Sequence, residues 1–361
     1  MAVAERRGGL RLIARLHRWL GLAAAIIWML QAATGVLLAF HFEADDALLS
    51  TERVPTDFDA IQQHMSGLDN AGGEAGTIWV WTTAGLPDRY VVLYRAPDGD
   101  ERTAKIDGAG RVLRDAAADD YTFLGLMREI HLTLLSGNVG HWILGIAGLL
   151  LFTNILFGLY MAWPRSGHWR RALVPVNSAG PSARSYSWHR AVGLWGAIPA
   201  AVSILVGSLM VFEHQIGDAI GVEEITLPAN PARGAPVGLD LAARAAVDAI
   251  PGSRFVGTTM PSVDDASYYA WVRGPGELYR GGYGGSLVIV DANDGSVRGA
   301  WPGTEAAPAR ALMGSLYPLH TGEAAGTLGR ILVMLTGVWL IVMAIVGVQL
   351  WQRRRAARRA R

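Results

Sequence analysis

Four histidines of this 361-residue chain fall into two sets with constant spacing. His189 follows His17 by 172 residues, and each of the two is directly followed by an arginine. His320 follows His131 by 189 residues. Imidazole is the commonest side-chain ligand of metal ions in proteins. A lone histidine has many structural uses, but two pairs at fixed offsets predict two sites that each hold iron or another metal between two imidazoles.

Glycines accompany the first pair on one predicted helix face. Gly21 lies one helical turn beyond His17, and Gly35 lies about five turns of 3.6 residues beyond it. The second copy repeats this pattern at Gly193 and Gly207. A glycine groove beside a histidine leaves room for a flat macrocycle, and imidazole is a standard axial ligand of haem iron. The alternative is that these small residues only allow close helix packing.

The two offsets relate longer stretches of the chain, which indicates an internal duplication. The matched pairs are Arg18 with Arg190, Ile26 with Ile198 and Phe40 with Phe212 at the first shift, and Gly125 with Gly314, Gly137 with Gly326, Gly140 with Gly329, Gly148 with Gly337 and Gly158 with Gly347 at the second. We therefore expect two copies of a helix–outer domain–helix unit, parallel to each other in the membrane.

Three further histidines flank the apolar segments without obeying the repeat. His41 aligns with Glu213, and His214 stands one residue out of register with it. His141 aligns with Arg330, so it has no symmetric partner. The pattern leaves three roles open for them: alternative ligands of the outer iron, groups that support the ligands, or part of a metal entry site.

Four apolar segments indicate membrane spans. The chain is 51% hydrophobic and 17% charged, with a mean hydropathy of +0.25. Residues 19–40, 141–163, 191–212 and 331–351 contain no Asp, Glu, Lys or Arg and have aromatic residues at their ends, and about 20 such residues cross a hydrocarbon core. The first segment is too long for a signal-peptide core, so we expect it to be a span. The lack of cysteine excludes disulfides, thiolate zinc sites and iron–sulfur clusters.

The arginines predict the orientation of these spans. Residues 1–18, 164–190 and 352–361 hold sixteen arginines and one acidic residue, Glu5. The positive-inside rule places these three segments in the cytoplasm and the connections 41–140 and 213–330 outside, in the periplasm. The overall charge of +1 thus divides into +15 inside and −14 outside. The near-neutral total argues against a nucleic-acid partner.

Both outer connections have the pattern of small α+β domains. The first has a helical pattern at 57–65 and strand-like runs at 77–82, 89–95 and 103–106. The second has a helical pattern at 239–250 and strand-like runs at 268–273, 286–291 and 296–301. We expect an α-helical membrane protein with four transmembrane helices and two α+β periplasmic domains, the first joined to its span by a juxtamembrane helix.

Several short motifs resemble the PepSY-associated transmembrane helix family. They are Leu16-His17-Arg18-Trp19-Leu20-Gly21-Leu22, Trp188-His189-Arg190-Ala191-Val192-Gly193-Leu194, Leu319-His320-Thr321-Gly322 and the Trp-Pro-Arg sequence at Trp163–Arg165. The resemblance covers nearly the whole chain, including PepSY-like outer domains. It implies a bacterial inner-membrane protein similar to iron-regulated membrane proteins and siderophore-iron reductases, which bind b-type haem and reduce ferric iron in the periplasm.

These observations lead to one favoured hypothesis and two alternatives. In the favoured one, His17 and His189 ligate an inner haem b, and His131 and His320 ligate an outer one, so that electrons cross the membrane to a ferric siderophore or another ferric chelate. The electron donor would be a quinol or a separate redox protein, because no flavin or nicotinamide domain is evident. The alternatives are a regulatory or partner-binding PepSY protein without redox activity and a divalent-metal transporter.

Overall fold

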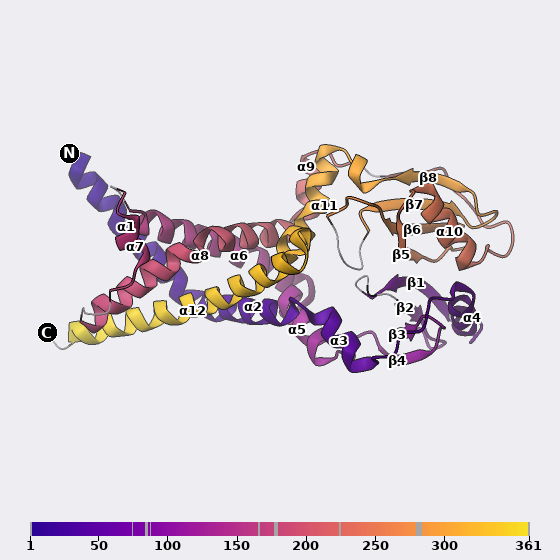
Figure 1. The fold of residues 1–361 in the computed structure, drawn as a ribbon, viewed down its shortest axis with the longest axis horizontal. Coiled ribbons are helices and arrows are strands. Elements are labelled where there is room, and N and C mark those ends of the chain that lie inside the picture. The colour runs from indigo at the N-terminus through magenta and orange to yellow at the C-terminus, as the bar shows by residue number, and fades with distance from the viewer. Residues whose placement is uncertain are drawn as a thin grey trace.

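The computed structural model describes residues 2–73, 75–83, 86, 88–164, 167–176, 180–223, 225–278 and 284–359, without the side chains of residues 2–7. Arg165 and Arg361, which entered the orientation argument, lie outside the described residues. The molecule is elongated and has three layers along its long axis: a helical bundle, a β-sheet across one end of the bundle, and two helices beyond the sheet (Figure 1). Both ends of the chain lie at the end of the bundle that is remote from the sheet (Figure 1).

Three helices in the described part of the chain are long and apolar enough to cross a membrane. They are α6 (Gly137–Ala162), α8 (Pro181–Val211) and α12 (Gly326–Arg359), the last preceded by the short η2 (Glu323–Ala325). A fourth span is possible if α1 (Ala2–Ala23) and α2 (Ala25–Leu38), which are bent by 63° relative to each other, count as one. The short α7 (Trp169–Leu173) lies in the connection between α6 and α8.

The first span differs from the continuous helix that its apolar sequence predicts. Ala24 separates α1 from α2, with backbone angles of φ −99° and ψ 2° that are not helical. Its N–H still bonds to the carbonyl oxygen of Leu20 at 3.1 Å, and its own carbonyl accepts from the N–H of Trp28 at 3.0 Å. The chain therefore turns sharply with little loss of hydrogen bonding. As a consequence, His17 and Gly35 do not share the face of one straight helix.

Small residues and two indole groups hold the bundle together. Helix α6 packs on α1 and α8, and α12 packs on α8 and α2. An added Cβ at Gly148 would lie 2.2 Å from the Ser208 hydroxyl, and one at Gly196 would lie 2.6 Å from the Trp339 ring. The Trp339 indole N–H donates to the carbonyl of Val192 at 2.6 Å, a bond between α12 and α8. These glycines have the close-packing function typical of membrane helices.

The strands of both outer segments belong to one antiparallel eight-stranded sheet, in the order β4-β3-β2-β1-β5-β6-β7-β8. The strands are β1 (Gly76–Thr82), β2 (Arg89–Arg95), β3 (Glu101–Asp107), β4 (Val112–Ala117), β5 (Arg254–Thr259), β6 (Ser267–Arg273), β7 (Ser286–Asp291) and β8 (Val297–Trp301). β1 pairs with β5, with Trp81 opposite Gly257. The expectation of two separate α+β domains was therefore wrong on this point, because two strand edges far apart in sequence complete each other's hydrogen bonding.

Helices cover only one face of this sheet. α4 (Phe58–Asp69) and α10 (Leu239–Ala249) lie on the side away from the bundle (Figure 1) and bury a core that includes Met65, Val80, Tyr268 and Val272. Neighbouring residues on a strand point to opposite faces. Lys105 therefore points toward the bundle, where it forms an ion pair with Asp45 of α3 (His41–Leu49).

Short helices connect the sheet with the bundle. α3 and α5 (Phe123–Thr133) flank the first four strands, and α9 (Glu213–Ala219) and α11 (Pro308–Thr321) flank the last four, with η1 (Gly303–Glu305) between β8 and α11. The elements α2 to α6 thus follow the same order as the elements α8 to α12: span, short helix, helix, four strands, helix, span.

Candidate functional site

The structure brings the four histidines together in the two predicted pairs. The rings of His17 on α1 and His189 on α8 have centres 6.1 Å apart and planes at 62°. The rings of His131 on α5 and His320 on α11 have centres 6.3 Å apart and planes at 33°. We refer to these as the inner pair and the outer pair. Each pair takes one residue from each half of the chain, so neither half can form a site alone.

The ring separations match two imidazoles on opposite sides of one metal ion. Imidazole–metal bonds in proteins are about 2.0–2.1 Å long, and a ring centre lies roughly 1.1 Å behind its nitrogen, so two opposed ligands have centres about 6.2–6.4 Å apart. The observed 6.1 and 6.3 Å agree with this value. Two rings in direct contact would stack or meet edge to face at 4.5–7 Å as well, so the hydrogen bonds of the nitrogens are needed to decide between the two arrangements.

Hydrogen bonds hold Nδ1 of three of the four rings. His17 Nδ1 lies 3.0 Å from the carbonyl oxygen of Asn154, and His320 Nδ1 lies 2.9 Å from that of Ser203. A carbonyl oxygen only accepts, so in these two rings Nδ1 donates its proton and Nε2 keeps its lone pair. His131 Nδ1 lies 2.9 Å from the hydroxyl of Thr34, whose own proton goes to the carbonyl of Leu30. This is the tautomer that a metal ligand bonded through Nε2 requires.

The Nε2 atoms of the four rings remain available. Within the part of the chain that the structure describes, none of them has a hydrogen bond. All four histidines are only half-buried. His189 differs from the others in that its Nδ1 is buried without a partner among the described residues. The outer pair is thus fixed by two Nδ1 hydrogen bonds and the inner pair by one.

A glycine faces each ring at close range. An added Cβ would lie 2.5 Å from Cε1 of His320 at Gly207, 3.0 Å from that of His17 at Gly158, 3.2 Å from that of His131 at Gly35 and 3.4 Å from that of His189 at Gly347. The four contacts have the symmetry of the sequence offsets. At Gly207 in particular, any side chain would displace the ring, because normal contacts between carbon atoms are about 3.5–4.0 Å.

The predicted glycine groove differs from the observed arrangement. Gly35 and Gly207 lie against the outer pair and not above the inner one. A Cβ at Gly21 would meet the Asn154 amide at 3.5 Å, and one at Gly193 would meet the Met343 methyl at 3.3 Å, so these two glycines lie against other side chains. The bend at Ala24 and the placement of α5 and α11 at the end of the bundle account for the difference. The repeat had already matched Gly158 with Gly347, the two glycines that do face the inner histidines.

The three additional candidate histidines lie outside the two pairs. His41 Nδ1 is 2.6 Å from the carbonyl of Leu38, and its ring packs on Phe42 at 3.8 Å between centres. Burial lowers the pKa of His41 below its ordinary 6.5, the hydrogen bond to Leu38 opposes this, and the charge of Arg128 adds to it. His141 Nδ1 lies 3.3 Å from the carbonyl oxygen of Leu132, and His214 is exposed.

Two features of the site could not be read from residue types. Thr34, Asn154 and Ser203 hold the rings through groups that every sequence contains in number, two of them by a backbone carbonyl. The described residues also contain no group of three or more His, Cys, Asp or Glu side chains arranged to hold a metal ion. Each pair therefore offers two protein ligands and no third.

The two pairs lie about one bilayer core apart. On the continuous helix α8, His189 belongs to the inner pair and Gly207 faces the outer one. Their spacing of 18 residues corresponds to about 27 Å at 1.5 Å per residue. A hydrocarbon core is about 30 Å thick.

Apolar spans and an extramembrane sheet define a multi-pass membrane protein. Residues 14–354 match the family described as the PepSY-associated TM region, and the chain belongs to this family. No curated protein matches the chain.

Proposed function

We propose that this protein binds two b-type haems, one at each histidine pair, and carries electrons across the bacterial inner membrane to a ferric chelate in the periplasm. His17 and His189 are the axial ligands of the inner haem, and His131 and His320 those of the outer haem. A ferric siderophore is the expected substrate class, and the electron donor is a membrane quinol or a separate redox protein.

The number of ligands at each site is the observation that carries this proposal. A zinc-type site needs about four ligands. Each pair offers two imidazoles about 6 Å apart, and the described residues supply no third donor. Haem needs only two axial ligands from the protein, since the macrocycle occupies the four equatorial positions. This arrangement favours haem over the direct binding of a transported divalent metal.

The chain's own residues also fit such a group. When bound, haem supplies a one-electron couple whose potential is set by its axial ligands and by its surroundings. The carbonyls of Asn154 and Ser203 keep the proton on Nδ1, so that Nε2 is available and the ring orientation is fixed. Gly158, Gly35 and Gly207 leave the rings space that a Cβ would fill.

The arrangement of the chain supports a transmembrane path. Both termini lie at the bundle end that is remote from the sheet (Figure 1), and the positive-inside rule assigns this end to the cytoplasm. The sheet and the outer pair then lie at the periplasmic side. The equal order of elements in the two halves supports two parallel helix–domain–helix repeats. In this arrangement the pairs form across the symmetry axis that relates the repeats.

An absorption spectrum of the detergent-purified protein, oxidised and then reduced with dithionite, tests this function. We expect a Soret band and the α and β bands of low-spin b-type haem, at two haems per chain. His17→Ala and His320→Ala should each remove about half of the haem, whereas His141→Ala should retain all of it. A colourless protein would overturn the haem proposal and favour a regulatory, partner-binding function.

A further inference from the structure

We propose that Arg254 and Arg273 form the docking site for an anionic ferric chelate, on the face of the sheet that is turned toward the bundle. This inference rests on the proposed function and specifies where the substrate binds and what charge it carries. It depends on a feature that the four histidines do not involve, namely a pair of arginines on two central strands.

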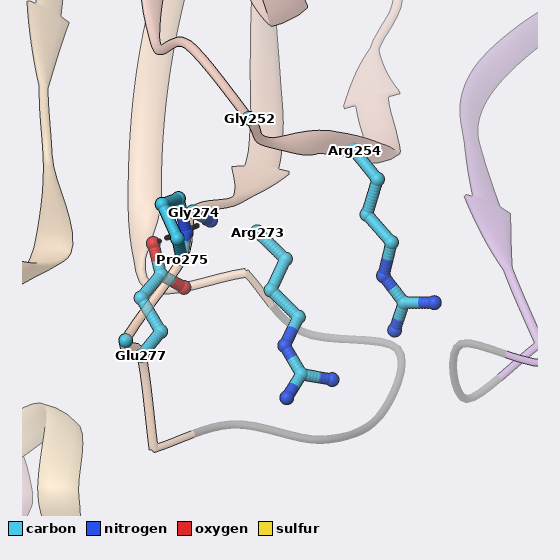
Figure 2. A pocket seen from close by; sticks show the side chains of 7 residues that line it. Gly252, Arg254, Arg273, Gly274, Pro275 and Glu277 are labelled. Atoms are coloured by element: carbon cyan, nitrogen blue, oxygen red, sulfur yellow. Dashed lines mark hydrogen bonds between the residues drawn. The ribbon is translucent and has the colours of Figure 1, made fainter.

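The two arginines lie side by side above a cavity. They are direct cross-strand partners on β5 and β6, so their side chains leave the sheet on the same face. Figure 2 shows both guanidinium groups extending in the same direction from the ends of their strands. The cavity has a volume of about 470 Å³ and is bordered by Gly252, Gly274, Pro275, Gly276 and Glu277 besides the two arginines.

The acidic residue of this cavity is bound by its own loop. The Glu277 carboxylate accepts the backbone N–H of Gly274 at 2.9 Å, that of Gly285 at 2.6 Å, and the hydroxyl of Ser286. In Figure 2 it turns toward Gly274 and away from the guanidinium groups. Its role is to close the loop between β6 and β7. The cavity therefore keeps a positive character on the side where the arginines lie.

The position of the cavity connects it with the outer histidine pair. In the antiparallel register, Arg273 and Trp301 lie at the same end of the sheet. From Trp301 the chain continues through η1 into α11, the helix that carries His320. Ser286, at this sheet end, accepts the N–H of Gly303 in η1 at 2.8 Å. A ligand at the arginines would thus lie at the end of the sheet from which the chain returns to the outer pair.

Aromatic side chains extend the same face. Trp271 lies two residues before Arg273 and therefore points to the same side of β6. Its ring centre is 6.4 Å from that of Trp81 on β1, and Gly257 on the strand between them leaves room for the Trp81 ring. Two indoles and two guanidinium groups suit an anion with a large planar or apolar body.

Charge complementarity defines the ligand class. The segments expected outside the membrane carry a net charge of −14, so an anion would be repelled from most of this surface. Arg254 and Arg273 offer a local exception, with planar donor forks that match carboxylate or catecholate oxygens. The ligand that fits is a ferric chelate with negatively charged oxygens at its surface.

Binding of gallium(III) citrate, a redox-inert analogue of ferric citrate, to the full-length protein in detergent tests this site by calorimetry. We expect saturable binding that weakens with salt, about tenfold weaker binding for Arg254→Gln or Arg273→Gln, and about 100-fold weaker binding for the double variant, as loss of charge-assisted hydrogen bonds implies. Arg254→Lys with Arg273→Lys should retain part of the affinity, because the charges remain. Arg244→Gln is the matched control, since Arg244 is exposed on α10, on the opposite face of the sheet.

The result is independent of haem, because gallium(III) is not reduced. Unchanged affinity in the double variant, or an equal loss in Arg244→Gln, would overturn the docking site. A colourless protein that still binds gallium citrate through the arginines would overturn the redox function and leave the anion site in place. The haem content and the melting temperature of each variant show whether it is folded.

Discussion

Replacing Gly207 by alanine should release the outer haem while leaving the inner one bound. The new Cβ would lie 2.5 Å from Cε1 and 2.7 Å from Nδ1 of His320. Normal contacts are about 3.5–4.0 Å, so the ring must move by about 1 Å. This movement takes Nδ1 away from the carbonyl oxygen of Ser203, which now accepts its proton at 2.9 Å.

The magnitude follows from two contributions. Overpacking of a tight contact costs about 1–3 kcal/mol, and loss of a typical hydrogen bond costs about 0.5–1.5 kcal/mol. Together they give about 2–4 kcal/mol, which lowers the affinity for the outer haem roughly 30- to 1,000-fold. The haem-to-protein ratio, measured by the pyridine haemochrome method, should fall from two toward one, with the reduced-minus-oxidised spectrum of one haem remaining.

The three other glycines provide graded controls. Gly347→Ala places its Cβ at 3.4 Å from the His189 ring, close to normal contact, so this variant should keep both haems. Gly35→Ala, at 3.2 Å from the His131 ring, should have an intermediate effect on the outer haem. The reasoning would be refuted if Gly207→Ala kept two haems, or if Gly347→Ala lost as much haem as Gly207→Ala does.

Two further predictions concern the stability of the sheet region. Asp46→Asn should lower the free energy of unfolding by about 3–5 kcal/mol, because it leaves the buried guanidinium of Arg89 without its charge partner at 2.8 Å. Asp240→Asn, which breaks an exposed pair on α10, should cost about 1 kcal/mol or less in the same thermal-unfolding experiment, and equal losses would contradict this distinction. Burial lowers the pKa of His64 below 6.5, although Asp115 opposes this, so below pH 6.5 the unfolded chain binds a proton that the folded chain resists. Stability should therefore fall between pH 7 and pH 5, and His64→Gln should make the fall in melting temperature measurably smaller.

Much of the strand pattern was accessible from the sequence. The predicted runs at 89–95 and 286–291 coincide with β2 and β7, and the helical pattern at 239–250 coincides with α10 to within one residue. β4 and β5 were not predicted. Val112–Ala117 has few strand-favouring residues, and Arg254–Thr259 contains a glycine that makes room for Trp81 of another strand. Such strands form because neighbouring strands pair with them, a context that a local pattern lacks.

The sequence by itself determined which histidines belong together. Fixed offsets of 172 and 189 residues assign His17 to His189 and His131 to His320, because duplicated segments in parallel orientation place equivalent residues at the same depth. The apolar segments likewise required a membrane, since about 20 uncharged residues can satisfy their backbone in lipid as a helix.

Only the tertiary structure decided which groups surround each ring. Helical periodicity assigned Gly35 to the face of His17, but the 63° bend at Ala24 ends that face, and Gly35 packs against His131 instead. The pairing of β1 with β5 and the meeting of Arg254 with Arg273 were likewise absent from the local pattern. Periodicity describes one straight element at a time, whereas bends and long-range strand pairing depend on contacts between residues that are distant in the chain.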